Sequence, residues 1–266
     1  MSGDEVFALV VSCVIGILGW RTWLGGLLLL EPLSRKPATQ FLGWLSPLAA
    51  AGALYFVLAR WSSHDVRDNP VYIFFYLAMG FGWAGLWNWI LPYAAGLSFR
   101  DDALELDNNA AAIGISGGLV GAALAFAGAN IGDGPGWWVV VFCALLSTGT
   151  MLILWIIGAW ITRVQEFISI DRDTAAGWRT AGYFIGAGLI LGRAVAGDWH
   201  STQQTVMDFL ARGWPVLILW AVALALDKIS KPTPQRPSPN AILLGALPCL
   251  LMTGMGIGDV ILQGAW

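Results

Sequence analysis

Long apolar segments alternate with short polar connectors along the whole chain. The segments run for about 20 residues or more without the alternation of apolar and polar positions that marks a strand, so they are typical of membrane-spanning helices. Lipid offers the backbone no hydrogen-bond partners, and a helix satisfies its backbone groups internally. The expected spans are 6–30, 38–60, 71–95, 109–131, 137–162, 174–197, 204–227 and 240–262.

Three of the later segments begin and end alike, which indicates an internal repeat. Each begins with a polar residue just before alanine and ends on Gly-Asp, and successive copies lie roughly 65 residues apart, enough for two spanning helices and their turns. The beginnings lie at 108–111, 173–176 and 239–241, and the ends are Gly132-Asp133, Gly197-Asp198 and Gly258-Asp259.

This repeat predicts an all-α polytopic membrane helical bundle of about eight transmembrane helices, arranged as four tandem parallel-repeat hairpins. We divide the chain into an N-terminal helical hairpin (1–62), a central double hairpin (63–199) and a C-terminal helical hairpin (200–266). A unit of two spans returns to the side where it began, so successive units share one orientation. Inverted repeats, which underlie many transporters, are not the pattern seen here.

The composition agrees with a membrane protein and excludes several functions. The chain is 57% hydrophobic and 12% charged, so the bilayer must be its solvent. It has no His and Glu at metal-ligand spacing, no nucleophile elbow and no phosphate-binding loop, so we expect no catalytic residue, metal or cofactor. Its net charge of −3 and the absence of a basic aromatic patch argue against nucleic acid as a partner.

The basic residues predict the orientation. They concentrate in alternate connectors, and by the positive-inside rule these connectors face the cytoplasm. Both termini and the three Gly-Asp ends are therefore expected outside. The basic residues in these connectors are Arg35, Lys36, Arg100, Arg163, Arg172, Lys228, Lys231 and Arg236.

Two of the repeated segments resemble a known family. Asn108-Asn109-Ala110-Ala111 through Ala129 and Asp173-Thr174-Ala175-Ala176 through Trp199, separated by a Trp-rich span, are similar to the YjfL-like family of bacterial inner-membrane proteins, whose domain has no established function. The resemblance covers about 71–199, and many family members consist of only those four spans. It implies a cytoplasmic (inner) membrane location and association with envelope-stress or polyamine-related systems, and it carries over no catalytic residues.

Small residues at four-residue spacing predict close helix packing, because they let two backbones approach. We expect the spans at 109–131 and 174–197 to pack against each other, with a subunit interface as the alternative. The small residues are Gly117, Gly121, Ala125 and Ala129 in the first span, with Gly182 and Gly186 in register in the second.

Arg193 and the Gly-Asp ends are the candidate outer site. Arg193 lies about one turn inside the outer end of its span, where its guanidinium is expected to reach Asp133, Asp198 or Asp259. The alternative is an arginine that extends alone to the headgroups, with each Gly-Asp serving only to end a helix and begin a turn.

Three further polar side chains fall inside the apolar segments, where each costs several kcal/mol unless it is paired or hydrated. Arg21 lies near mid-depth if its span runs to residue 30, or at the cytoplasmic boundary if the span ends early. Arg179 is expected to extend to the cytoplasmic interface. Asn88 is expected to hydrogen-bond between helices.

These features favour a non-enzymatic membrane subunit or scaffold of an envelope-associated assembly. We expect it to contact the lipid bilayer and to associate with itself or with other membrane and envelope proteins. The alternative function is a small-cation channel or transporter that uses the outer carboxylates. A hydrated path from Asn88 to the outer aspartates would favour that alternative.

Overall fold

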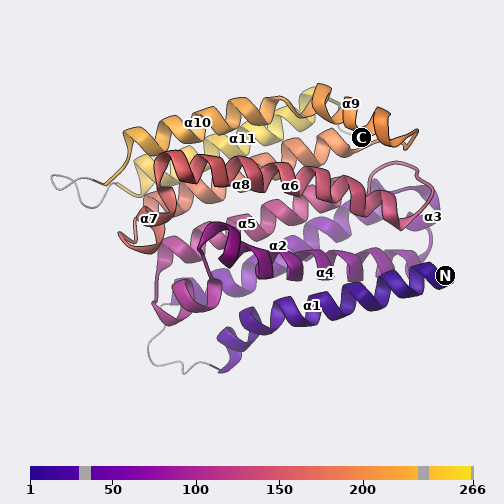
Figure 1. The fold of residues 1–266 in the computed structure, drawn as a ribbon, viewed down its shortest axis with the longest axis horizontal. Helices are drawn as coiled ribbons and strands as arrows, with labels where there is room; N and C mark the ends of the chain where they lie inside the picture. The colour runs from indigo at the N-terminus through magenta and orange to yellow at the C-terminus, as the bar shows by residue number, and fades with distance from the viewer. Residues whose placement is uncertain (30–36, 233–239, 265–266) are drawn as a thin grey trace.

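The computed structural model describes residues 1–29, 37–232 and 240–264, and over these residues the chain folds as an all-helical bundle (Figure 1). The all-helical part of the predicted fold class is therefore confirmed. Both marked chain ends lie at one end of the bundle, together with α3, and α7 lies at the other end. The helices are α1 (Gly3–Leu29), α2 (Pro37–Arg60), α3 (His64–Arg67), α4 (Pro70–Ala95), η2 (Phe99–Glu105), α5 (Asn109–Gly128), α6 (Trp137–Thr162), α7 (Val164–Ser169), α8 (Thr174–Val195), α9 (Thr202–Gly213), α10 (Pro215–Ile229), η3 (Ile242–Ala246) and α11 (Leu247–Leu262).

Among the described residues, six helical segments are long and apolar enough to cross a membrane: α1, α2, α4, α5, α6 and the continuous η3–α11 segment. Helices α9 and α10 make a seventh if they count as one span, although they meet at a bend of 45°. Pro215 stands at the start of α10, where its missing N–H breaks the helical ladder. Six to seven of the eight predicted spans are therefore supported as candidates.

Helix α8, which we predicted as a span, is 22 residues long but does not meet this criterion of apolarity. It carries Arg179 and Arg193, and α5, α6, α10 and α11 pack around it. Most of its residues are buried by protein instead of being left to face lipid. An enclosed helix can be less apolar than one whose side chains contact acyl chains.

Polar side chains cap the helices that begin the predicted repeats. The Asn108 side chain accepts from the N–H groups of Ala110 and Ala111 at the start of α5. Asp173 does the same for Ala175 and Ala176 at the start of α8. Asn240 accepts from the first two residues of η3. The recurring polar residue before each apolar segment therefore accepts hydrogen bonds from backbone donors that the start of the helix leaves free.

Helices α5 and α8 run parallel and approach at backbone distance. A Cβ added at Gly121 would overlap the carbonyl of Phe184, and one at Gly128 would overlap that of Gly192. From the other side, Gly188 faces the Gly121 carbonyl. The small residues therefore pack the two helices against each other within one chain, as expected, and the subunit-interface alternative does not hold for this face.

Gly182 and Gly186 face a different helix from the one we predicted. A Cβ on Gly182 would overlap the backbone of Cys249, and a Cβ on Gly186 would overlap the backbone of Met252. Both glycines therefore allow α11 to pack closely against α8. The glycines of α8 that face α5 are Gly177, Gly188 and Gly192 instead. Glycines on two faces allow α8 to pack closely against α5 and α11 at once.

The Gly-Asp pairs do not all end helices. Gly132 and Gly197 have φ of 101° and 139°, values that glycine adopts readily, and both follow the end of a helix. Gly258, by contrast, lies inside α11, which continues to Leu262. The third predicted end is therefore wrong, and Gly264, with φ of 81°, follows the helix instead.

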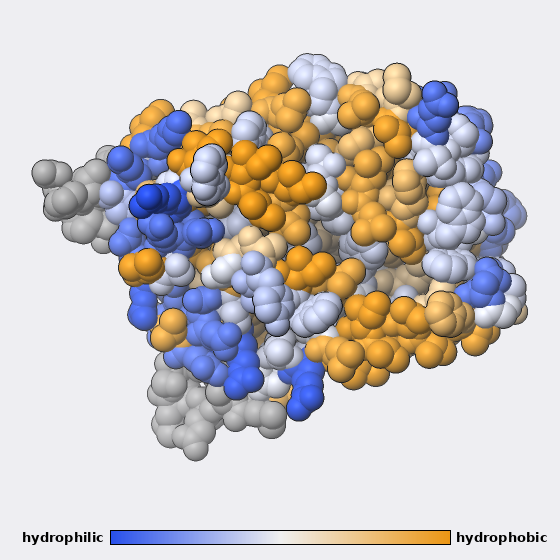
Figure 2. All heavy atoms as spheres, in the orientation of Figure 1, coloured by the Kyte–Doolittle hydropathy of each residue, from blue (hydrophilic) through white to orange (hydrophobic). Residues whose placement is uncertain are grey.

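The surface hydropathy fits a bilayer around the middle of the bundle. Figure 2 shows hydrophobic residues over the central part of this face and hydrophilic residues gathered toward both ends. Large apolar side chains such as Leu18, Leu48 and Ile153 are exposed, at 62%, 69% and 58%. A soluble protein would rarely expose so much apolar surface, so lipid is the expected neighbour.

We predict that Gly121→Ala destabilises the protein by about 1–3 kcal/mol, because the added methyl would force α5 and α8 apart. Gly149→Ala on α6 is the matched control, since nothing lies within 4 Å of its added Cβ. The control should be neutral, or stabilising by up to about 1 kcal/mol from helix propensity. Unfolding in mixed micelles measures both, and equal effects of the two substitutions would contradict the packing.

Candidate functional site

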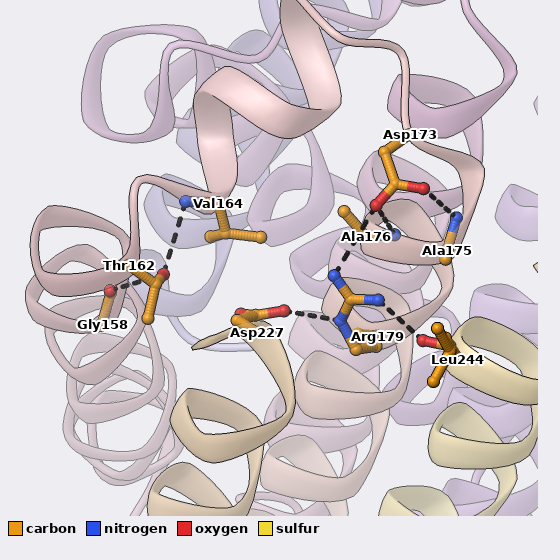
Figure 3. Close-up of polar contacts among 9 residues, drawn as sticks. All are labelled: Gly158, Thr162, Val164, Asp173, Ala175, Ala176, Arg179, Asp227 and Leu244. Atoms are coloured by element: carbon orange, nitrogen blue, oxygen red, sulfur yellow. Dashed lines mark hydrogen bonds and ion pairs between the residues drawn. The ribbon is translucent and has the colours of Figure 1, made fainter. Parts of the chain in front are cut away.

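A buried charge cluster lies among α8, α10 and η3 (Figure 3). The Arg179 side chain is 1% exposed. Its Nε donates to Asp227 Oδ1 at 2.6 Å, its Nη1 donates to the Leu244 carbonyl at 2.6 Å, and its Nη2 lies 3.7 Å from Asp173 Oδ2. The first two are charge-assisted hydrogen bonds, and the third is an ion pair beyond hydrogen-bond distance.

Each member of this cluster is held by its own element. Asp173 is the N-cap of α8, and Arg179 points back toward it from the second turn of the same helix. Asp227 stands near the end of α10, and Leu244 lies in η3. Burial raises the pKa of the Asp173 carboxyl, whereas the Arg179 guanidinium and the N–H groups of Ala175 and Ala176 lower it.

The expectation that Arg179 extends to the interface is therefore wrong. Its guanidinium turns inward because two carboxylates, from the preceding turn and from α10, neutralise it inside the bundle. A signal was present in the sequence, since Asp227 lies at the end of a predicted span on the same side of the membrane as Arg179. An acid and a base at equal depth in different apolar segments indicate an ion pair.

A polar cavity of about 360 Å³ opens at the end of the bundle that holds the N-terminus. Asp133 and Asp198 line it, and they are joined directly: the Asp133 N–H donates to Asp198 Oδ1 at 2.8 Å, and the Trp199 N–H donates to the Asp133 carbonyl at 2.8 Å. The two Gly-Asp turns thus pair with each other. The other charged residues that line the cavity are Glu5, Asp65, Asp208 and Arg212.

Arg193 and Asp259 belong to a separate group near the end of α11. The Arg193 Nη2 donates to the carbonyls of Gln263 and Gly264, each at 3.0 Å. Asp259 accepts from the Gln263 side chain at 2.7 Å and attracts the Arg193 charge. Neither residue lines the cavity that holds Asp133 and Asp198. The structure therefore brings the four predicted residues together as two pairs.

Asn88 lines a second cavity, of about 210 Å³, beside η2. The residue is 8% exposed, and both polar atoms of its side chain lack a hydrogen-bond partner among the described residues. The expected hydrogen bond between helices is thus not formed. This cavity and the outer one share no lining residue. Along the chain, Leu119 and Ala122 of α5, which are 0% exposed, lie between Ile115, which lines this cavity, and Ala129, which lines the outer one.

Arg21 is exposed on α1, which continues for two further turns to Leu29. The interpretation that the span ends at Arg21 is therefore wrong. Its side chain lines a groove with Gly25 and Leu86, so α4 forms the other wall. Within residues 1–29, 37–232 and 240–264, no group of three or more His, Cys, Asp or Glu side chains is arranged to hold a metal ion.

Residues 135–237 match a family model described as Domain of Unknown Function (DUF350). The match runs from α6 to α10 and contains Asp173, Arg179 and Asp227. It overlaps the region 71–199, on which the resemblance to the YjfL-like family rests, only in part. No curated protein and no solved structure matches the chain. The protein is therefore a multi-pass membrane protein with a domain of unknown function.

We predict that Asp227→Asn destabilises the protein by about 3–5 kcal/mol, because Arg179 would keep a buried charge without its closest counter-ion. The control is Glu166→Gln, which removes an exposed pair with Arg163 at 3.9 Å and should cost less than about 1 kcal/mol. The double variant Arg179→Leu/Asp227→Leu should recover part of the loss. Free energies of unfolding in mixed micelles test this, and an Asp227→Asn effect as small as the control would contradict it.

Proposed function

We propose that this protein is a non-enzymatic membrane subunit or scaffold of an envelope-associated assembly in the bacterial cytoplasmic membrane. The observation that carries this proposal is the separation of the two polar cavities by fully buried side chains of α5. A closely packed centre suits a structural role better than it suits conduction. The apolar exterior would then contact lipid and the partner proteins.

The finer architecture belongs to this proposal. We place the chain with the YjfL-like proteins and regard it as four tandem hairpins, with boundaries at 1–62, 63–199 and 200–266 and both termini outside. Hydrogen bonds between residues 65 positions apart support the repeat. The Asp133 N–H donates to the Asp198 side chain, and the Arg179 guanidinium donates to the Leu244 carbonyl. The two chain ends at one end of the bundle are consistent with an even number of passages.

A cation channel or transporter is the second candidate. The specific observation in its favour is the outer cavity, where the carboxylates of Glu5, Asp65, Asp133, Asp198 and Asp208 outnumber the guanidinium of Arg212. Carboxylates around a mouth raise the local concentration of cations. A path inward from this cavity would have to open between residues that are now buried.

The two functions are separated by reconstituting the full chain in liposomes and measuring the entry of a monovalent cation. We expect entry at the rate of protein-free liposomes, and no change with Asp133→Asn/Asp198→Asn. In parallel, protein extracted from its native membrane directly into polymer-bounded nanodiscs should have a protein mass above that of one 28.5 kDa chain.

Each of the two measurements has a result that would contradict the proposed function. Saturable cation entry that the double asparagine variant abolishes would establish the second candidate in place of the first. A single chain with no companion protein in the nanodiscs would contradict the assembly role, whatever the cation measurement gives. The variant protein must keep the unfolding midpoint of the wild type, which excludes a loss of fold as the cause.

A further inference from the structure

A groove of about 710 Å³ runs along the outside of the bundle between α1 and α4, which pack side by side (Figure 1). Residues of α1 spaced at three and four positions form one wall, and Leu86 and Trp89 of α4 form the other. Leu18 and Trp89 are 62% and 61% exposed, so the groove opens onto the apolar surface. An acyl chain of the surrounding bilayer fits such a surface.

The groove is kept open by glycine. Nothing lies within 4 Å of a Cβ added at Gly25, so no neighbouring side chain fills the space there. The stem of Arg100 lies against α1 at Gly26, with the Arg100 Cγ 3.6 Å from the position of an added Cβ. Arg100 thereby reaches the groove from η2, at the end away from the N-terminus.

Two guanidinium groups line this groove. Arg21 is exposed and forms no ion pair among the described residues. Arg100 uses its Nε for an exposed contact with Glu105 at 3.0 Å, a surface pair of little energy. An apolar groove with cationic groups in its wall complements a molecule that has hydrocarbon chains and an anionic head.

The smaller cavity that Asn88 lines adjoins this groove, since both are lined by Thr22, Trp89 and Arg100. Asn88 is more than nine-tenths buried, and its amide has an unpaired donor and an unpaired acceptor. A buried amide without partners is destabilising, and a bound polar group would offset that cost. The groove supplies apolar and cationic surface, and the adjoining cavity supplies a neutral polar group.

We propose that this groove, with Arg21, Arg100 and Asn88, binds an anionic phospholipid of the surrounding bilayer. The acyl chains lie along α1 and α4, and the phosphate lies between the two arginines. This assignment is independent of whether the protein acts as a scaffold or conducts cations. It places a specific lipid between α1 of the N-terminal hairpin and α4 of the central double hairpin, outside residues 135–237, which match the domain of unknown function.

The test is native mass spectrometry of the full-length protein, titrated in detergent with phosphatidylglycerol or with phosphatidylcholine of the same acyl chains. We expect tight binding of one phosphatidylglycerol and at least tenfold weaker binding of phosphatidylcholine. Arg21→Gln and Arg100→Gln should each weaken phosphatidylglycerol binding about fivefold to tenfold. Lys228→Gln, which removes an exposed charge from α10, should leave binding unchanged.

A steric variant separates the groove from simple surface charge. Gly25→Leu keeps every arginine, and its Cβ would meet nothing within 4 Å, so the protein should fold while phosphatidylglycerol binding is lost. Inorganic phosphate should not displace the lipid, because it lacks the chains that occupy the groove. Equal binding of the two lipids, an unchanged affinity in Gly25→Leu, or displacement by phosphate alone would each overturn the proposal.

Discussion

The approach of α5 to α8 at backbone distance is the constraint on which the rest of the bundle depends. In lipid, no hydrophobic force drives two apolar helices together, so association relies on packing and on polar contacts. Gly121 and Gly128 of α5 and Gly188 and Gly192 of α8 remove the side chains that would keep the backbones apart. Such contacts gain dispersion energy and place Cα–H groups against carbonyl oxygens. A second set of glycines brings α11 to the far side of α8.

Enclosure of α8 makes the buried charges possible. Because protein surrounds this helix, Arg179 meets carboxylates from Asp173 and Asp227 and not hydrocarbon. At the opposite end of the same helix pair, the turns that hold Asp133 and Asp198 bond to each other. The α5–α8 pair is therefore fixed by polar contacts at both ends and by glycine contacts between them. The two polar cavities share no lining residue.

Apolar length and glycine spacing were enough to predict the helices and the contact between α5 and α8, because both depend on local sequence. Asn108 and Asp173 were found as segment beginnings for the same reason. Six to seven of the eight predicted spans are apolar enough to be candidates, because apolar length alone does not tell whether protein or lipid surrounds a helix, and α8 is enclosed by protein. Gly258-Asp259 was misread as a helix end because the same dipeptide is tolerated inside α11. Which carboxylate meets which arginine depends on contacts between distant segments, so the partners of Arg179 were missed.

The parallel contact of α5 and α8 is tested most directly by a disulfide between Gly114→Cys and Thr180→Cys, in a chain whose three native cysteines are replaced by alanine. A Cβ added at Gly114 lies 3.7 Å from the Thr180 Cβ, within the range of about 3.5–4.5 Å that a disulfide requires. After mild oxidation in membranes, peptide mass spectrometry should find the two segments joined in most molecules. The pair Gly149→Cys and Thr180→Cys should stay reduced, because nothing lies within 4 Å of a Cβ added at Gly149. Absence of the first cross-link, or equal formation of both, would contradict the packing on which this account of the bundle rests.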